Sequence, residues 1–307
     1  MSVIGLDTSN YTTSIAWFNG RDGENCSKLL PVKQGELGLR QSDAVFAHIK
    51  GLPELSGRLF SNHSLEGVTA VGVSTRPRAV EGSYMPCFMV GYSHAKLLAD
   101  SLHVPLVEVS HQQGHVAASL WSANHLELMD EPHLAWHLSG GTTELLLVEP
   151  DEKNVQCTKI GGTTDISAGQ LIDRTGQLLE LPFPSGKHLD ALSREAQGRE
   201  VFKVKCPELE FSLSGVQNKV QQFHEQNGIP AETAAFALRC IAGAVRQATL
   251  NAQKKYPGLR VVFSGGVASN TLLREVLDPL NPVFSQPQYS TDNAMGVAVL
   301  THRIQEG

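Results

Sequence analysis

The chain has 307 residues, of which 41% are hydrophobic and 18% are charged, an ordinary balance for a globular protein. This length is sufficient for two lobes with a sizeable buried core. The formal net charge of −6 argues against a broadly basic protein that binds nucleic acid non-specifically, although it is compatible with a local basic patch or a basic partner.

The first predicted element is a short strand over residues 1–6, which leads into the polar loop Asp7-Thr8-Ser9. A returning strand over residues 15–18 ends at the turn Asn19-Gly20 and completes a hairpin. A loop of this composition either presents backbone N–H and hydroxyl groups to a phosphate or forms a plain polar turn.

The next segment combines two predicted helices with a strand. Apolar positions spaced three and four apart favour a helix over 39–59, and a buried strand covers 70–74. A second helix, over 88–102, carries the small residues Gly91, Ser93 and Ala95. A further strand over 105–109 leads the chain directly to His111.

His111 and His115 are four residues apart, so on a helix they lie one above the other on the same face. Two neutral imidazoles in this arrangement bind one divalent transition-metal ion when a third ligand comes from elsewhere in the fold. Taken alone, the pair is also typical of two surface or packing histidines. Gln112 follows His111, so the chain lacks the general base of His-Glu-x-x-His zinc peptidases.

The design of the first hairpin recurs in the second half of the chain. A strand over 134–138, the loop Ser139-Gly140-Gly141 and a returning strand over 144–148 again form strand, polar loop and strand. The glycines allow a ligand to approach the backbone closely. This repeat predicts a duplicated α/β architecture.

Two later motifs also place polar residues where a ligand could bind. A buried strand over 260–263 ends at Ser264-Gly265-Gly266 before a helix, an arrangement typical of an anion or nucleotide cradle and also of a tight packing turn. Near the end of the chain Asp292 precedes a small apolar helix, where it is also a good N-cap. Glycine loops at strand ends in both halves predict a ligand cleft between two lobes.

The cysteines indicate the compartment. There are five of them, scattered and without C-x-x-C spacing, which is typical of reduced thiols in a cytoplasmic protein. No apolar run approaches membrane-spanning length, and no basic region precedes an apolar one at the first residues, so we expect no membrane partner.

Taken together, the ordered motifs resemble the TsaD family of tRNA threonylcarbamoyladenosine synthases, once described as O-sialoglycoprotein endopeptidases. The resemblance covers nearly the whole chain. The motifs that carry it are Asp7-Thr8-Ser9, His111-x-x-x-His115, Ser139-Gly140-Gly141, Ala168-Gly169-Gln170-Leu171-Ile172-Asp173 with Pro184-Ser185-Gly186, Phe211-Ser212-Leu213-Ser214-Gly215, Ser264 to Asn270, and Ser290-Thr291-Asp292-Asn293-Ala294.

This resemblance implies the duplicated α/β fold of the actin, sugar-kinase and heat-shock-protein ATPase (ASKHA) superfamily, with two lobes and a central cleft. Residues 1–130 and 293–307 would form the first lobe, and residues 131–292 the second. It also implies one iron or zinc ion held by His111, His115 and Asp292.

The resemblance further implies a nucleotide site. Asp173, Gly186 and Asn270 would hold the ribose of an adenylate, because a carboxylate and an amide suit vicinal hydroxyls and a glycine permits close approach. The remaining substrate- and nucleotide-binding positions would be Asp7, Ser139, Gly140, Gly141, Gly265 and Gly266.

The implied reaction transfers the threonylcarbamoyl group of threonylcarbamoyl-AMP to N6 of adenine 37 in tRNAs that read codons beginning with A. The metal would act as a template and Lewis acid rather than as a source of hydroxide. Partners would be tRNA and TsaB- and TsaE-like subunits of a modification complex. The resemblance assigns no catalytic acid or base.

Four segments depart from the usual family pattern. Asn10-Tyr11-Thr12-Thr13 replaces an acidic pair after Thr-Ser-Cys, and Arg76-Pro77-Arg78-Ala79 replaces Arg-Gly-Pro-Gly. Thr142 stands where bacterial members often carry histidine, and Gln217-Asn218 replaces Leu-Lys or a similar pair. Two alternatives therefore stay open. One is a divergent paralogue that binds metal and nucleotide but serves another acceptor or a non-catalytic role in a complex. The other is a small-molecule kinase or ATPase of the same fold.

Overall fold

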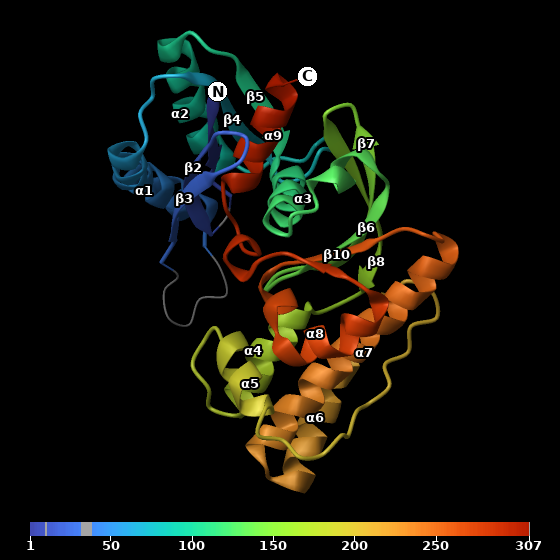
Figure 1. The fold of residues 1–307 in the computed structure, drawn as a ribbon. Helices are drawn as coiled ribbons and strands as arrows, with labels where there is room; N and C mark the ends of the chain where they lie inside the picture. The colour runs from blue at the N-terminus through green and yellow to red at the C-terminus, as the bar shows by residue number, and fades with distance from the viewer. Residues whose placement is uncertain (10, 32–38, 307) are drawn as a thin grey trace. The chain divides into compact units, whose positions relative to one another are not determined.

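The computed structural model describes residues 1–9, 11–31 and 39–306, so Asn10 in the first departing loop lies outside the described residues. The chain divides into two compact units, which can be followed by colour in Figure 1. Unit 1 comprises Met1–Glu131, Glu149–Cys157 and Asp292–Gly307, and unit 2 comprises Pro132–Val148 and Thr158–Thr291.

Two segments belong to a different unit from the one expected. Asp292 and Glu149–Cys157, predicted within the second lobe, are part of unit 1. Hydrogen bonds explain the second assignment: Gln113 Nε2 donates to the carbonyl oxygen of Val155 at 2.8 Å, and Arg303 Nε donates to that of Lys153 at 3.1 Å.

Unit 1 contains a five-stranded sheet in the order β3-β2-β1-β4-β5. Its first two strand pairs are antiparallel, whereas β1, β4 and β5 run parallel. The predicted helix over 88–102 is confirmed as α2. The elements are β1 (Ser2–Asp7), β2 (Thr12–Phe18), β3 (Gly23–Leu29), α1 (Gln41–Asn62), β4 (Val68–Arg76), α2 (Phe88–Leu102), β5 (Leu106–Ser110), α3 (His111–Ser122), η1 (Leu126–Asp130) and α9 (Met295–Gln305).

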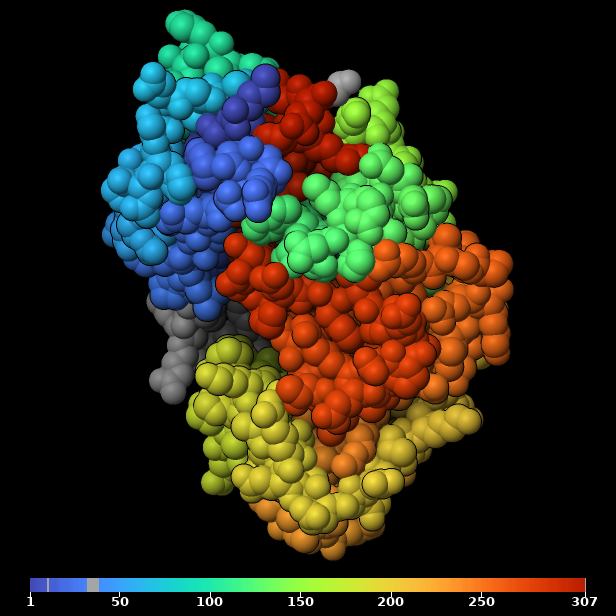
Figure 2. All heavy atoms as spheres, viewed as in Figure 1, coloured from blue at the N-terminus to red at the C-terminus, as the bar shows by residue number. Residues whose placement is uncertain are grey.

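Helices pack on both faces of this sheet. Ile4 and Leu6 of β1 pack with buried leucines of α1 and apolar residues of α2. The alternate face carries Gly5, whose register partner is Gly72, and a Cβ at Gly5 would lie 2.6 Å from the backbone nitrogen of Ala298. These glycines therefore allow α9 to approach the strands closely. In Figure 2 the dark red atoms of α9 lie beside the blue atoms of the first hairpin.

Unit 2 contains a six-stranded sheet in the order β11-β10-β6-β7-β8-β9. Its longest described helix is α7, which has proline at its first position. The elements are β6 (His133–Leu138), β7 (Thr143–Asp151), β8 (Asn154–Thr163), α4 (Ala168–Leu178), α5 (Gly186–Ser193), β9 (Glu210–Phe211), α6 (Ser214–Asn227), α7 (Pro230–Lys255), β10 (Val261–Ser264), η2 (Gly266–Ser269), α8 (Thr271–Leu277), η3 (Asp278–Leu280), β11 (Val283–Phe284) and η4 (Pro287–Tyr289).

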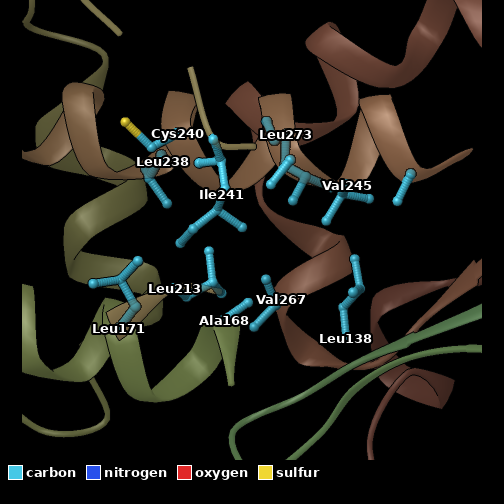
Figure 3. Close-up of a cluster of buried hydrophobic side chains, with 14 of the residues drawn as sticks. Leu138, Ala168, Leu171, Leu213, Leu238, Cys240, Ile241, Val245, Val267 and Leu273 are labelled. Carbon is cyan, nitrogen blue, oxygen red and sulfur yellow. The ribbon is translucent and has the colours of Figure 1, made fainter. Parts of the chain in front are cut away.

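The core of unit 2 forms around the apolar face of α7. Leu238, Ile241 and Val245 of this helix point toward Leu171 of α4 and Val267 of η2 (Figure 3). All five side chains are buried. Each such side chain contributes about 1.5–3 kcal/mol when it is removed from water, so burial against α7 helps to hold α4 and the loop after β10 in place.

The two sheets share one topology. In unit 1 the antiparallel pair β1–β2 is flanked by parallel β4 and β5. In unit 2 the antiparallel pair β6–β7 is flanked by parallel β10 and β11 in the same order. The predicted duplication is thus present in the strand order. Within the described residues, no helix is both long and apolar enough to span a membrane.

Candidate metal centre and nucleotide site

The histidine pair begins a helix that is held firmly at its first turn. β5 ends at Ser110, which caps α3: its hydroxyl accepts from the N–H of Gln113, and Gln113 in turn accepts from the N–H of Ser110. This reciprocal capping box satisfies free N–H groups of the first turn. His111 is the first helical residue and His115 lies one turn later, with ring centroids 4.3 Å apart.

Asp292 reaches the pair because two helix backbones nearly touch. A Cβ at Gly296 of α9 would lie 1.8 Å from the carbonyl oxygen of Gly114 of α3, so the crossing requires glycine at position 296. Asp292 precedes α9, and its Oδ1 lies 3.2 Å from His115 Nε2 and 3.5 Å from His111 Nε2. Asp292 does not act as the N-cap of α9, because that position is Ala294.

The three side chains form a potential metal-binding group. Ligand atoms of His111, His115 and Asp292 all lie within 4.8 Å of one another. Two imidazole nitrogens and one carboxylate oxygen are the donor set of mononuclear iron and zinc sites that keep open coordination positions. The residues therefore suit the predicted ion in number and chemistry.

Asp7 supports this group from the adjacent strand. Its Oδ2 accepts a hydrogen bond from His111 Nδ1 at 2.7 Å, and its Oδ1 accepts from the N–H of Ser9 at 2.8 Å. A carboxylate on Nδ1 fixes the tautomer and leaves the Nε2 lone pair available as a ligand. The structure thus gives Asp7 a contact with His111, whereas its predicted contact with substrate stays a prediction.

A topological argument from the sequence points to this contact. Asp7 ends β1 and His111 directly follows β5, and both strands run parallel to β4 between them. Carboxyl ends of parallel strands meet at one edge of a sheet. The strand assignments alone therefore bring this aspartate near the histidine.

Electrostatics couple the group tightly. Burial acts to lower the pKa of His111, because it disfavours the charged imidazolium form. The charges and hydrogen bonds of the Asp7 and Asp292 carboxylates have the larger, opposite effect and raise the pKa of His111 to about 10. Burial acts to raise the pKa of Asp292, yet hydrogen bonds and charge from His111 and His115 hold that pKa well below its usual value. The two carboxylates therefore favour positive charge at the position of His111.

In unit 2, the loop Ser139-Gly140-Gly141 is built onto the start of α4. The hydroxyl of Ser167, the N-cap of α4, donates to the carbonyl oxygen of Gly140 at 2.6 Å. A Cβ at Gly169 would lie 2.4 Å from the Cα of Gly140, so the contact requires Gly169. Among the described residues, nothing lies within 4 Å of a Cβ built on Gly140 or Gly141. The predicted phosphate loop therefore has open space beside it.

Asp173 and Gly186 meet where α4 contacts the beginning of α5. Asp173 Oδ1 accepts from the N–H of Ser185 at 2.8 Å, and Gly186 is the first residue of α5. Burial raises the pKa of Asp173, and the bond from Ser185 opposes the rise. A Cβ on Gly186 would meet no described atom within 4 Å. The two predicted ribose contacts thus lie side by side.

Asn270 is held by a carboxylate that the sequence analysis missed. Its Oδ1 accepts from Leu273 and caps α8, while its Nδ2 donates to Asp190 Oδ1 at 2.9 Å. The same Asp190 oxygen accepts from the N–H and hydroxyl of Thr271. Asp190 lies one turn after Gly186 on α5, so this helix brings Gly186 and Asn270 together.

The two glycines of the turn after β10 have different surroundings. Gly265 has a φ of +90°, and a Cβ there would lie 2.1 Å from the carbonyl oxygen of Leu138. Its packing against the end of β6 therefore requires glycine. At Gly266 the nearest described atom would be 3.9 Å from a Cβ, so this residue leaves space for a ligand.

Comparison with solved structures defines the class of fold. Full-length HypF, in a phosphate- and nucleotide-bound form, aligns with a TM-score of 0.64 at 15% identity over the whole of this chain and 47% of HypF. The ROK hexokinase of Thermus thermophilus aligns with a TM-score of 0.53 at 14% identity over the whole of both chains. These likenesses concern the fold alone, and they confirm the predicted ASKHA architecture.

Comparison of sequences then identifies the family. The family model described as TsaD, tRNA N6-adenosine threonylcarbamoyltransferase, matches residues 38–299. A tRNA N6-adenosine threonylcarbamoyltransferase of Carboxydothermus hydrogenoformans is 30% identical over 325 aligned positions, covering 99% of this chain and 93% of that relative. The chain belongs to the TsaD family, a family of threonylcarbamoyltransferase enzymes, and the predicted resemblance is confirmed.

Proposed function

We propose that this protein transfers the threonylcarbamoyl group of threonylcarbamoyl-AMP to N6 of adenine 37 in tRNAs that read codons beginning with A. The N6 nitrogen would form a bond to the carbamoyl carbon, the bond from that carbon to the phosphate oxygen would break, and AMP and one proton would leave. The observation that carries the proposal is the His111–His115–Asp292 group with Asp7 behind it, in a chain of the TsaD family.

The residues of unit 1 would hold the acyl end of the substrate. His111, His115 and Asp292 would bind one iron or zinc ion, which when bound supplies Lewis-acid polarisation of the threonylcarbamoyl group. Asp7 would keep His111 in the orientation and tautomer that ligation needs.

The residues of unit 2 would hold the adenylate. The loop Ser139-Gly140-Gly141 and Gly266 would receive the phosphate through backbone N–H groups. Asp173, Gly186 and Asn270 would contact the ribose hydroxyls. AMP is both part of the substrate and the leaving group, so the same contacts would hold AMP before and after the transfer.

The proposal includes tRNA and TsaB- and TsaE-like subunits as partners. A net charge of −6 supports the need for a partner, because phosphate neutralisation requires clustered cationic groups that this chain has only locally. The departures at Tyr11 and at Arg76-Pro77-Arg78 favour one other function, transfer to a different acceptor by the same metal and nucleotide residues.

The test is reconstitution with partner subunits, threonylcarbamoyl-AMP and tRNA that lacks the modification. Mass spectrometry of nuclease-digested tRNA should detect threonylcarbamoyladenosine with the wild-type chain and a loss of more than tenfold with His115→Ala. The variant His125→Ala, outside the group, serves as the matched control and should retain activity. Release of AMP without modified tRNA would instead support the different acceptor, and release of ADP from ATP would support a kinase.

A further inference from the structure

An irregular segment of unit 2 connects α5 to β9 and runs beside α7 (Figure 1). Residues 196–206 of this segment contain no helix or strand. Side chains from the start, middle and end of α7 nevertheless bond its backbone. These contacts are Glu232 with the N–H groups of Gln197 and Gly198, Cys240 with the N–H of Phe202, and Asn251 with the carbonyl oxygens of Cys206 and Glu208. The course of the segment is therefore fixed at three points.

The middle of this segment is extended. Its contacts with Cys240 and Asn251 come from residues that are only four positions apart in the chain. Cys240 and Asn251 themselves are eleven positions apart on α7, about 16 Å along the helix axis. A span of four residues approaches this length only when the chain is extended. Side chains of such a chain alternate between its two sides.

Alternation around Val204 places two lysines on the outer side of the extended stretch. Val204 is buried in the core of unit 2, whereas Lys203 and Lys205 are exposed. Next-but-one side chains of an extended chain point to the same side and start about 6.6 Å apart. Lys203 and Lys205 therefore form a pair of neighbouring cations that faces solvent.

The exposed cations of the segment are not neutralised by acidic groups. In the described part of the chain, Arg199, Lys203 and Lys205 take part in no ion pair. Glu200 is the one acidic residue between Arg199 and Lys205. Its Oε2 lies beside Gly198, 2.2 Å from the position that a Cβ would take there. This carboxylate thus lies at the first contact with α7 rather than beside the lysines.

Lys219 of α6 adds a fourth cation to this surface. Its Nζ lies 5.9 Å from the ring centroid of Phe202, the residue directly before Lys203. Its hydrogen-bond partner is the neutral amide of Gln222, at 3.2 Å, so the charge of Lys219 is not neutralised there. A cluster of cations, called the α5–β9 patch, therefore lies on unit 2 of a chain whose net charge is −6. Its members are Arg199, Lys203, Lys205 and Lys219.

We propose that the α5–β9 patch binds the phosphate backbone of the RNA acceptor, an inference that rests on the proposed function. The net charge of the chain opposes binding of a polyanion, so the attraction has to come from a local cluster of unpaired cations. The segment that carries the patch follows α5, which begins at Gly186 and is about 12 Å long. A stem of several base pairs is longer than this helix, so an RNA that reaches the nucleotide site with one base also reaches the patch. These contacts orient the RNA and leave the choice of base to the site itself.

The test is a fluorescence anisotropy titration of the full-length protein with labelled, unmodified tRNA at several salt concentrations. The double variant Lys203→Gln, Lys205→Gln should weaken binding about tenfold or more at low salt, because two phosphate contacts are lost. For the same reason the slope of log K against log salt should become less steep by about 1.4–1.8. The matched control Lys50→Gln, Arg58→Gln removes the same charge from exposed positions of α1 and should leave affinity and slope unchanged.

The remaining outcomes separate the patch from the proposed function. An affinity and a slope that are equal in the wild type and the patch variant overturn the patch, and so does a wild type that binds no tRNA at low salt. Poly-glutamate that binds more tightly than tRNA, and loses affinity in the patch variant, overturns the RNA assignment in favour of an acidic protein. Patch-dependent binding of tRNA that is never modified in the reconstituted reaction supports the patch and overturns the proposed function.

Discussion

The hairpins β1–β2 and β6–β7 occupy the same position in two sheets of the same topology, yet their loops carry different chemistry. The first places a buried carboxylate, Asp7, against His111. The second has Ser139, Gly140 and Gly141, with open space beside both glycines. The duplicated fold thus places one loop at the corresponding sheet edge in each unit. We propose that the side chains of each loop set its role, with the first supporting a metal ligand and the second receiving a phosphate.

The largest effect is expected for Asp292→Ala, which removes the carboxylate from the proposed metal group of unit 1. Loss of a direct ligand should lower metal affinity by more than the about 10–100-fold that is typical of outer-shell partners. Elemental analysis of metal-loaded protein measures it, with the exposed Asp22→Ala as the matched control. Equal metal content in Asp292→Ala and wild type would show that the group is not the metal site.

Asp7→Asn tests the chemical difference between the two hairpins directly. An amide holds His111 less strongly than a carboxylate, so metal affinity should fall about 10–100-fold while some metal binding persists. Competition with a chelator of known affinity measures the change. Ser139→Ala, at the corresponding hairpin of unit 2, should leave metal affinity unchanged. If both variants lose metal equally, the division of roles between the hairpins is wrong.

Gly169→Ala and Gly140→Ala distinguish packing from ligand space in the second hairpin. A methyl group at Gly169 would overlap the backbone of Gly140, so the free energy of unfolding should fall by about 1–3 kcal/mol. A methyl group at Gly140 meets open space, so stability should change by less than about 0.5 kcal/mol. Denaturant titration measures both, and AMP titration should show weaker binding to Gly140→Ala. Equal loss of stability in both variants would contradict the open space at Gly140.

Local patterns predicted much of this structure, and contacts between distant residues account for what they missed. The strand–loop–strand repeat identified the duplication, and the four-residue spacing placed His111 and His115 on one helix face. The steric need for glycine at position 296 arises where α9 crosses α3, and neither helix sequence predicts this crossing by itself. In the sequence, nothing distinguishes Asp190 from other aspartates on helices. Its contact with Asn270 forms only because α5 packs beside α8.

The smallest effect concerns His48, which contacts the first hairpin and has no part in ligation. Its Nδ1 lies 2.8 Å from Thr13 Oγ1, and burial lowers its pKa to about 4 against the opposing charge of Asp7. Since the unfolded chain protonates this histidine near pH 6.5, stability should be full above that pH and decrease as the pH falls toward 4. The loss should be of the order of 1–2 kcal/mol. Denaturant titrations of wild type and His48→Gln between pH 7 and pH 4 measure it, and the variant should lack this part of the decrease. Equal slopes in the two proteins would show that His48 is not the titrating group, and that the buried side of the first hairpin does not respond to pH.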